Sequence, residues 1–205
     1  MTITDLVAPE AILPALKVIS KKQALQELAA RAASLTGQNE RAVFEVLLQR
    51  EKLGTTAVGY GVAIPHGKLP KLERLFGLFA RLERPIDFES MDGQPVDLIF
   101  LLLAPEGAGA DHLKALARIA RLLRDQDVAK KLRASRDAQA IYSVLALLRC
   151  VSSSPAAAQV ALLKRAGAAA GVDEGEHVER TMIPETVGPG ADETFKAAQG
   201  SGIVV

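Results

Sequence analysis

The first quarter of the chain contains two stretches in which apolar residues recur at helical spacing. Ser20 and Gln23 form a capping box, so we predict a helix over Lys21–Thr36. Asn39 can cap a second helix that ends at Lys52. The apolar positions that support these helices are Leu25, Leu28, Ala29, Ala32 and Leu35 in the first, and Val43, Val46 and Leu47 in the second.

Three more helices are predicted in the second half of the chain, each behind a residue that can cap a helix. Asp111 is expected to cap the first. Either Asp125 or Asp127 should begin the second, which ends near Arg133, and Ser135 should cap the third. The expected buried positions are Leu113, Leu116, Ala120 and Leu123 in the first of these helices, and Ile141, Val144, Leu145 and Leu148 in the last.

Strands are predicted before, between and after these helices. Phe76–Leu82 alternates as a strand does, and Arg84–Pro85 is expected to end it. Val96–Ala104 is nearly all apolar, as in a central strand covered on both faces. Ile12–Val18 contains a proline and fits an edge strand, and Val62–Ile64 fits a short buried one. The mixture of helices and strands predicts an α/β fold.

Composition limits the classes of partner. The chain has 205 residues, 49% of them apolar, which is enough for one well-packed domain with residues to spare. The net charge of +1 gives no general field that would attract nucleic acid or an anionic membrane. The longest apolar run, Leu98–Ala104, has seven residues, whereas a membrane-spanning helix needs about 20. We therefore expect no nucleic-acid partner and no membrane insertion.

The composition changes at Arg149. Residues 149–205 hold a serine cluster, an alanine-rich stretch and then Gly, Glu, Thr and Pro without periodicity. We expect a domain over residues 1–148 and a largely disordered extension over residues 149–205. The one cysteine, Cys150, cannot form an internal disulfide, and the first residues lack a basic region followed by an apolar one. The expected location is the cytoplasm.

The segment with the most chemical content is Gly54–Leu69, which is rich in glycine and contains a Pro-His-Gly step. Its histidine, His66, should stand at the mouth of the strand Val62–Ile64. An ordinary imidazole has a pKa near 6.5, so one ring nitrogen can act as a nucleophile while a hydrogen bond holds the other. From local sequence alone, a histidine beside a strand end is more often a loop residue without a chemical role than a catalyst.

Two further residues are candidates for the same chemistry. Arg50, in the last turn of the second helix, is either a cation that interacts with the helix C-terminus or a guanidinium that holds two phosphate oxygens. His112, in the first turn of a later helix, is either a solvent-facing residue or part of an anion site that includes backbone amides. Spacing alone leaves these alternatives open.

Other kinds of site fit the sequence poorly. His66 and His112 could bind a metal together with a carboxylate, but no His-x-x-x-His spacing or cysteine cluster accompanies them. The sequence has no P-loop for ATP and no Gly-x-Ser-x-Gly elbow for a serine hydrolase. We therefore expect no metal and no cofactor.

The segment around His66 resembles the nitrogen-regulatory IIA proteins of the bacterial phosphoenolpyruvate phosphotransferase system, within the fructose/mannitol IIA family (EIIA type 2). The resemblance covers about residues 4–145. Several motifs in the same order are more specific than one short pattern. The motifs are Leu48–Thr56, Gly59–Leu69, Arg84–Phe88, Gln94–Leu98 and Asp111–Leu113.

The resemblance implies a fold and a role for each candidate residue. The implied fold is the mannitol-type IIA fold, a single domain with a mixed sheet of about five strands and helices on both faces. The implied carrier of a phosphoryl group is His66, with Arg50 beside it. His112 is implied as a second histidine that approaches the first.

The resemblance also implies a function. The chain would be a phosphotransferase-system component that forms a phosphohistidine intermediate, with an HPr-like phosphocarrier protein as donor. Its phosphorylation state would regulate partners such as potassium-transport components or sensor kinases. One alternative is a sugar-specific IIA component that passes phosphate to a IIB domain for sugar uptake. Another is a binding module that has lost phosphorylation, although the presence of His66, Arg50 and His112 together argues against it.

Overall fold

The computed structural model of the protein describes residues 3–147, and its sheet is built around the strand β6 (Val96–Pro105). Residues 98–104 of this strand have 0% exposure, as the continuous apolar run predicts. β6 is antiparallel to β5 on one side and parallel to β3 and β4 on the other. The predicted central strand is therefore confirmed.

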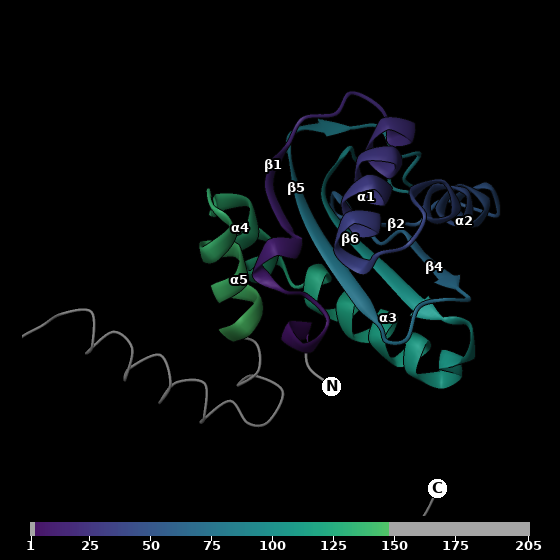
Figure 1. The fold of residues 1–205 in the computed structure, drawn as a ribbon. Coiled ribbons are helices and arrows are strands. Elements are labelled where there is room, and N and C mark those ends of the chain that lie inside the picture. Colours follow the sequence, from purple (N-terminus) through teal and green to yellow (C-terminus); the bar gives the residue numbers. More distant parts are fainter. Residues whose placement is uncertain (1–2, 148–205) are drawn as a thin grey trace, which may run out of the picture.

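The sheet has six strands and is mixed (Figure 1). Its order is β1-β5-β6-β3-β2, and β4 also pairs with β6. β1 is parallel to β5 and lies at the edge, where the missing N–H of Pro14 is tolerated. The other strands are β1 (Ile12–Leu16), β2 (Ala57–Gly59), β3 (Val62–Ala63), β4 (His66–Leu69) and β5 (Phe76–Ile86).

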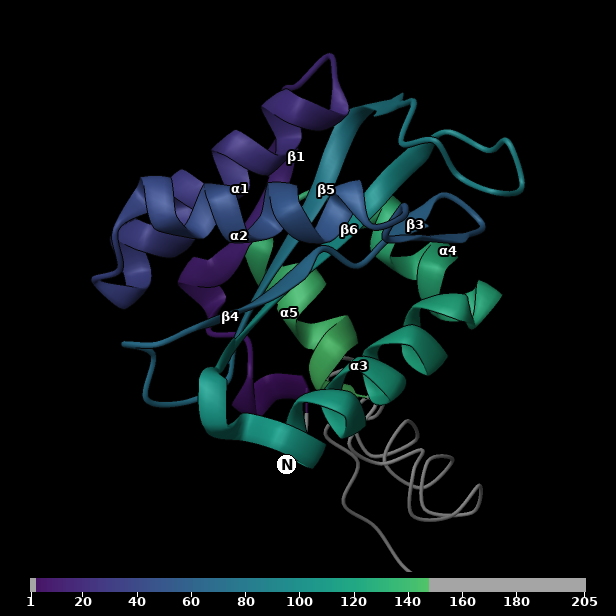
Figure 2. The same cartoon turned by 90° about the vertical axis from the view of Figure 1, so that its right-hand side faces the viewer.

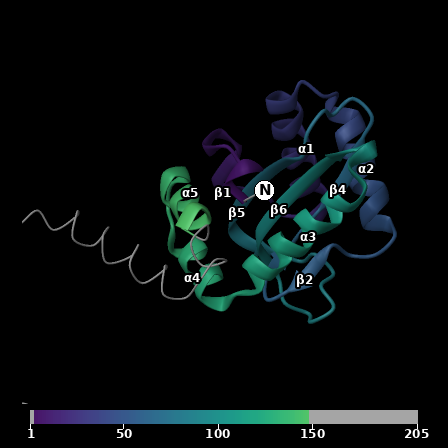
Figure 3. The same ribbon diagram turned by 90° about the horizontal axis from the view of Figure 1, so that it is seen from below.

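Helices cover both faces of this sheet. Figures 2 and 3 show α1 and α2 on one face, and α3, α4 and α5 toward the other. The α-helices are α1 (Lys21–Thr36), α2 (Glu40–Lys52), α3 (Gly109–Arg124), α4 (Gln126–Ala134) and α5 (Ala138–Leu147), and the short 3₁₀ turns are η1 (Ile3–Asp5), η2 (Pro9–Ala11) and η3 (Glu106–Ala108). The predicted α/β class with a mixed sheet is confirmed. Within residues 3–147, no helix combines the length and apolar character required to cross a membrane.

Three predicted helix starts are confirmed by their caps. The Ser20 hydroxyl accepts a hydrogen bond from the Gln23 backbone N–H at the start of α1. Asn39 does the same for α2 by accepting from the N–H of Ala42. For α4 the capping residue is Asp125, the first of the two candidates.

The start of α3 was predicted wrongly. The helix begins at Gly109, not after Asp111, and Asp111 does not cap it. Its buried residues are His112, Ala115, Ile119 and Leu123, whereas Leu113 is 66% exposed. Of the expected stripe, Leu123 is buried and Leu116 and Ala120 pack against the core, so only Leu113 was wrong, because the structure places His112 inside instead.

Three other boundaries also differ from the prediction. α5 begins after Asp137, whose carboxylate accepts from the Ala140 N–H, while Ser135 ends α4. β5 continues past Pro85 because the ladder with β6 is irregular between Arg81 and Ile86, so the proline breaks no regular pair. The strand predicted at 62–64 is β3, which ends at Ala63, and a further short strand that was not predicted, β4, follows after residues 64–65. The expectations for Leu148 and for residues 149–205 lie outside the described residues.

Candidate functional site

His66 is the first residue of β4 and pairs with Leu102 of β6. It was expected just beyond a strand, and the structure instead places it inside one, half-buried. The Pro65 carbonyl accepts a hydrogen bond from the Leu102 N–H, which fixes the backbone immediately before the histidine. The ring of His66 is therefore carried by the sheet and not by a free loop.

The hydrogen bonds of His66 define its tautomer. Its Nδ1 lies 2.8 Å from the Ile64 carbonyl oxygen. Because a carbonyl oxygen can only accept, Nδ1 carries the proton and Nε2 keeps a lone pair. Nε2 accepts a hydrogen bond of 3.1 Å from Nε of Arg50. The lone pair is thus directed at a guanidinium.

The surroundings keep His66 neutral. Burial lowers its pKa below the ordinary value, and the positive charge of Arg50 lowers it further. The Ile64 carbonyl and the Glu51 carboxylate act in the opposite direction but do not reverse the shift. The imidazole therefore offers an unprotonated Nε2 at neutral pH, which a nucleophile requires.

Arg50 lies in the last turn of α2 and makes two contacts. Its Nε donates to His66, and its Nη1 donates to the Gly54 carbonyl just beyond the helix, at 3.0 Å. Arg50 therefore satisfies a carbonyl at the helix end and also faces the histidine, and its contact with phosphate oxygens stays a prediction.

α2 approaches β4 closely at Gly67. A Cβ atom at this position would lie 2.3 Å from Cγ1 of Val46, a residue of α2. The backbone of Gly67 has no positive φ, so the glycine is required for space and not for its conformational freedom. This contact determines how near Arg50 comes to His66.

His112 approaches His66 from the other side. It is 7% exposed, and the two ring centroids are 5.6 Å apart with an interplanar angle of 57°. Its Nε2 is buried and has no hydrogen-bond partner among the described residues. Burial lowers the pKa of His112, and repulsion from His66, when that ring is protonated, and from the positive charge of Lys68 lowers it further. A buried nitrogen without a partner is costly, so a ligand that satisfied it would be favoured here.

The structure brings all three predicted residues together and adds one that was missed. Glu51 is buried, although it follows Arg50 on a surface helix. The signal was present in the sequence, because Glu51 continues the buried i, i+4 series of Val43 and Leu47. A charged residue on an apolar stripe indicates a specific partner.

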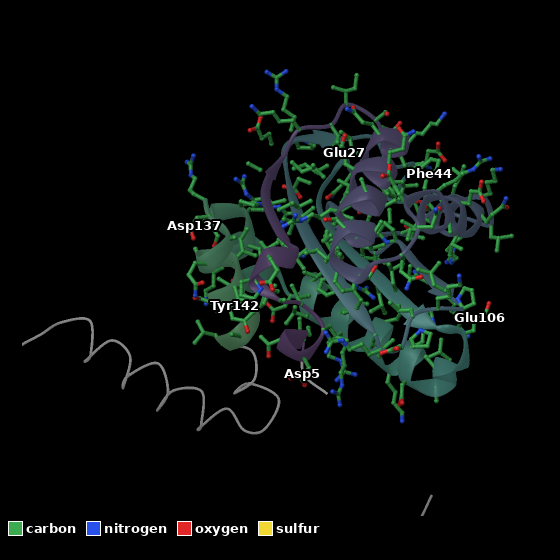
Figure 4. The ribbon with its side chains drawn as sticks, viewed as in Figure 1. Asp5, Glu27, Phe44, Glu106, Asp137 and Tyr142 are labelled. Atoms are coloured by element: carbon green, nitrogen blue, oxygen red, sulfur yellow. The ribbon has the colours of Figure 1, made fainter. Side chains whose placement is uncertain are left out.

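The site lies away from a hollow of about 670 Å³. That hollow is lined mainly by residues 4–11 and 71–76, with Tyr142 of α5 at its wall. Figure 4 shows Tyr142 of α5 and Asp137, just before α5, on one side of the molecule, and Phe44 of α2 and Glu106 on the other. Among residues 3–147 no group of three or more His, Cys, Asp or Glu gathers as a metal site.

Comparison with known proteins gives consistent matches. The family model described as "Phosphoenolpyruvate-dependent sugar phosphotransferase system, EIIA 2" matches residues 5–147. The nitrogen regulatory protein of Bradyrhizobium diazoefficiens is 94% identical over 147 residues, which cover 72% of this chain and 96% of that protein.

Solved structures agree with these matches. The crystal structure of nitrogen regulatory protein IIA-Ntr from Neisseria meningitidis has a TM-score of 0.67 and 34% identity, and the match covers 70% of this chain and 98% of that one. Enzyme IIA for mannitol from Escherichia coli, in complex with phosphorylated enzyme IIB, has a TM-score of 0.59 and 19% identity, and the match covers 68% and 96% of the two chains. At that identity the likeness concerns the fold alone.

Proposed function

The chain belongs to the EIIA type 2 family of the phosphoenolpyruvate-dependent sugar phosphotransferase system, in its nitrogen-regulatory branch, and from this we propose that it is a phosphohistidine carrier and regulator. His66 accepts a phosphoryl group from an HPr-like phosphocarrier protein. The phosphorylation state then controls which partner proteins bind. Potassium-transport components and sensor kinases are the kinds of partner we propose.

The observation that carries this proposal is the state of the His66 ring. Its Nδ1–H donates a hydrogen bond to the Ile64 carbonyl, and its unprotonated Nε2 accepts one from Nε of Arg50. In transfer, the Nε2 lone pair forms a new N–P bond while the N–P bond of the donor phosphohistidine breaks. The electron pair of that bond returns to the donor ring nitrogen. The proton stays on Nδ1 and keeps its hydrogen bond to the Ile64 carbonyl oxygen, which holds the ring in place once Nε2 carries the phosphoryl group.

Arg50 and His112 stabilise the transferred group. As the phosphorus approaches Nε2, the guanidinium leaves the lone pair and donates to phosphoryl oxygens, a task suited to a planar group that is always charged. The His112 ring lies 5.6 Å from the His66 ring, and its buried Nε2, which lacks a partner among the described residues, can donate to the same oxygens when it carries the proton. Catalysis therefore rests on positioning and charge.

Regulation follows from the charge that phosphorylation adds. A phosphoryl group brings about −1.5 to −2 charges and strong acceptors to a site on the surface of the sheet. A partner that contacts His66 therefore meets two different surfaces. The 94% identical relative is named a nitrogen regulatory protein, which supports regulation over sugar delivery. The mannitol protein was solved with phosphorylated enzyme IIB. An experiment on this chain must therefore distinguish regulation of partner proteins from phosphate transfer to a IIB domain.

Phosphorylation in vitro tests the carrier role. With phosphoenolpyruvate and the upstream phosphotransferase proteins, the wild type should gain one acid-labile phosphoryl group by intact mass, and His66→Ala should gain none. Arg50→Lys should slow the reaction because lysine keeps the charge but loses the planar fork. Arg41→Lys, an exposed change on the same helix, is the matched control. A phosphoryl group on His112 in the His66→Ala variant would contradict the assignment.

A second experiment separates regulation from sugar delivery. Phosphorylated and unmodified protein are each offered to a purified sensor kinase, a potassium-transport component and a IIB domain. Regulation predicts that one form binds the first or second protein more tightly and that no phosphate passes to the IIB domain. If phosphate passed rapidly to the IIB domain and both forms bound the other two proteins equally, the regulatory role would be wrong and the transport alternative would take its place.

A further inference from the structure

Glu51 is the one carboxylate among the buried polar side chains of residues 3–147. Both of its oxygens accept from the backbone N–H of Thr56, at 3.2 and 3.1 Å, and Oε2 also accepts from the Thr56 hydroxyl at 2.6 Å. Lys21 donates to Oε1 at 3.3 Å. A buried charge is tolerated only with such a set of partners.

The Glu51–Thr56 contact closes the connection between α2 and β2. Inside that connection, the Gly54 N–H donates to the Glu51 carbonyl and the Gly54 carbonyl accepts from Nη1 of Arg50. The connection therefore holds the carbonyl that orients the guanidinium. If the loop relaxed, Arg50 would lose one of its two fixed contacts.

Thr56 also leads to the histidine. Its carbonyl accepts from the N–H of Ile64 at 2.9 Å, and the carbonyl of Ile64 accepts from Nδ1 of His66 at 2.8 Å. One hydrogen-bonded path thus runs from Glu51 through Thr56 and Ile64 to His66. Glu51 is linked to both partners of the Arg50–His66 hydrogen bond.

Lys21 anchors the same carboxylate from α1. Its side chain is 19% exposed and also pairs with Glu89 at 2.8 Å, and its Nζ lies 5.6 Å from the ring centroid of Phe88. The Thr55 hydroxyl donates to the Phe88 carbonyl at 2.8 Å. The connection is therefore fixed from two directions.

From this path we propose that Glu51, with Thr56 and Lys21, is a positioning group for phosphoryl transfer, which sets the relative placement of Arg50 and His66. This rests on the proposed function for its kinetic consequence. Its structural consequence, a fixed Arg50–His66 contact, does not depend on phosphorylation. Neither Glu51 nor Thr56 touches the reacting atoms.

The sharpest test uses two substitutions at one position. Thr56→Val removes the hydroxyl that donates to Glu51 and keeps the shape and the backbone, whereas Thr56→Ser keeps the hydroxyl. We expect the maximal transfer rate of Thr56→Val to fall about 10- to 100-fold with the KM for the donor protein little changed, and Thr56→Ser to retain the wild-type rate. Glu51→Gln should behave like Thr56→Val. Glu45→Gln, an exposed glutamate on the same helix, is the control.

A second readout needs no phosphorylation. In the wild type the Arg50 Nε–H should give an NMR signal that exchanges slowly with water, and Thr56→Val and Glu51→Gln should accelerate that exchange. If Thr56→Val and Glu51→Gln both kept the wild-type transfer rate and the wild-type exchange of the Arg50 Nε–H, the positioning role would be overturned. A transfer rate in Thr56→Ser as low as in Thr56→Val would overturn it too. If Glu51→Gln fails to fold, the Thr56 pair decides. If the wild type accepts no phosphate, the proposed function fails, whereas the exchange measurement still tests the positioning.

Discussion

Gly67→Ala tests whether close packing of α2 on β4 sets the geometry of the site. The added Cβ would lie 2.3 Å from Cγ1 of Val46, about 1.1 Å inside the 3.4 Å at which ordinary contact begins. Because a valine in a helix strongly prefers one rotamer, the strain must be shared between that side chain and a shift of α2. Overpacking of this kind costs about 1–3 kcal/mol, or roughly 2–12 °C in Tm for a domain of this size.

The shift should also reach the chemistry. Arg50 lies one turn beyond Val46 on α2, and its Nε is 3.1 Å from Nε2 of His66. A displacement on the order of 1 Å can reduce a rate by about 100-fold. We therefore expect Gly67→Ala to lower both the melting temperature and the phosphoryl-transfer rate, measured by calorimetry and by intact mass against time.

A double-mutant cycle shows whether Val46 is the cause. Val46→Ala removes the Cγ1 atom, so Gly67→Ala should cost much less in that background, with an interaction energy of at least about 1 kcal/mol. Gly107→Ala is the control, because a Cβ there meets nothing within 4 Å and no positive φ is involved. If Gly67→Ala matched the wild type in stability and rate, this account of how α2 is positioned would be refuted.

Two further outcomes follow from charges in the structure. Burial lowers the pKa of both His66 and His112 in the folded protein. Below the ordinary histidine pKa of about 6.5 the unfolded chain therefore binds more protons than the folded one, and the free energy of unfolding decreases as the pH is lowered. The decrease is at most about 1.4 kcal/mol per pH unit for each histidine. Urea unfolding at pH 7.5 and 5.5 should show this loss, and replacing both histidines by Asn should reduce it. Arg133→Met removes paired hydrogen bonds of 2.7 and 2.8 Å to Asp97 and should lower the unfolding free energy by about 1–3 kcal/mol, whereas the exposed Arg136→Met should stay within about 0.5. If Arg133→Met lost no more unfolding free energy than Arg136→Met, the stabilising role of the Arg133–Asp97 pair would be contradicted.

Local signals in the sequence determined much of the fold. Capping residues such as Ser20 and Asn39 mark helix starts because their side chains satisfy backbone N–H groups only a few residues away. The apolar run of β6 predicts a fully buried strand because consecutive side chains of a strand point to opposite faces, so both faces must be covered. The candidate residues His66, Arg50 and His112 came from motif resemblance, and the structure places them in one cluster.

The tertiary structure decided whatever depends on contacts between distant segments. β2 and β4 have three and four residues, too few for a periodic signal, and they exist because β3 and β6 pair with them. His112 turned inward, although polar residues usually face water, because α3 begins earlier and presents that face to His66. Glu51 is buried because Lys21, 30 residues earlier, and the backbone of Thr56 satisfy its charge. Such pairings depend on the whole packed fold, because the hydrogen bonds and packing that stabilise them form only when both segments are in place.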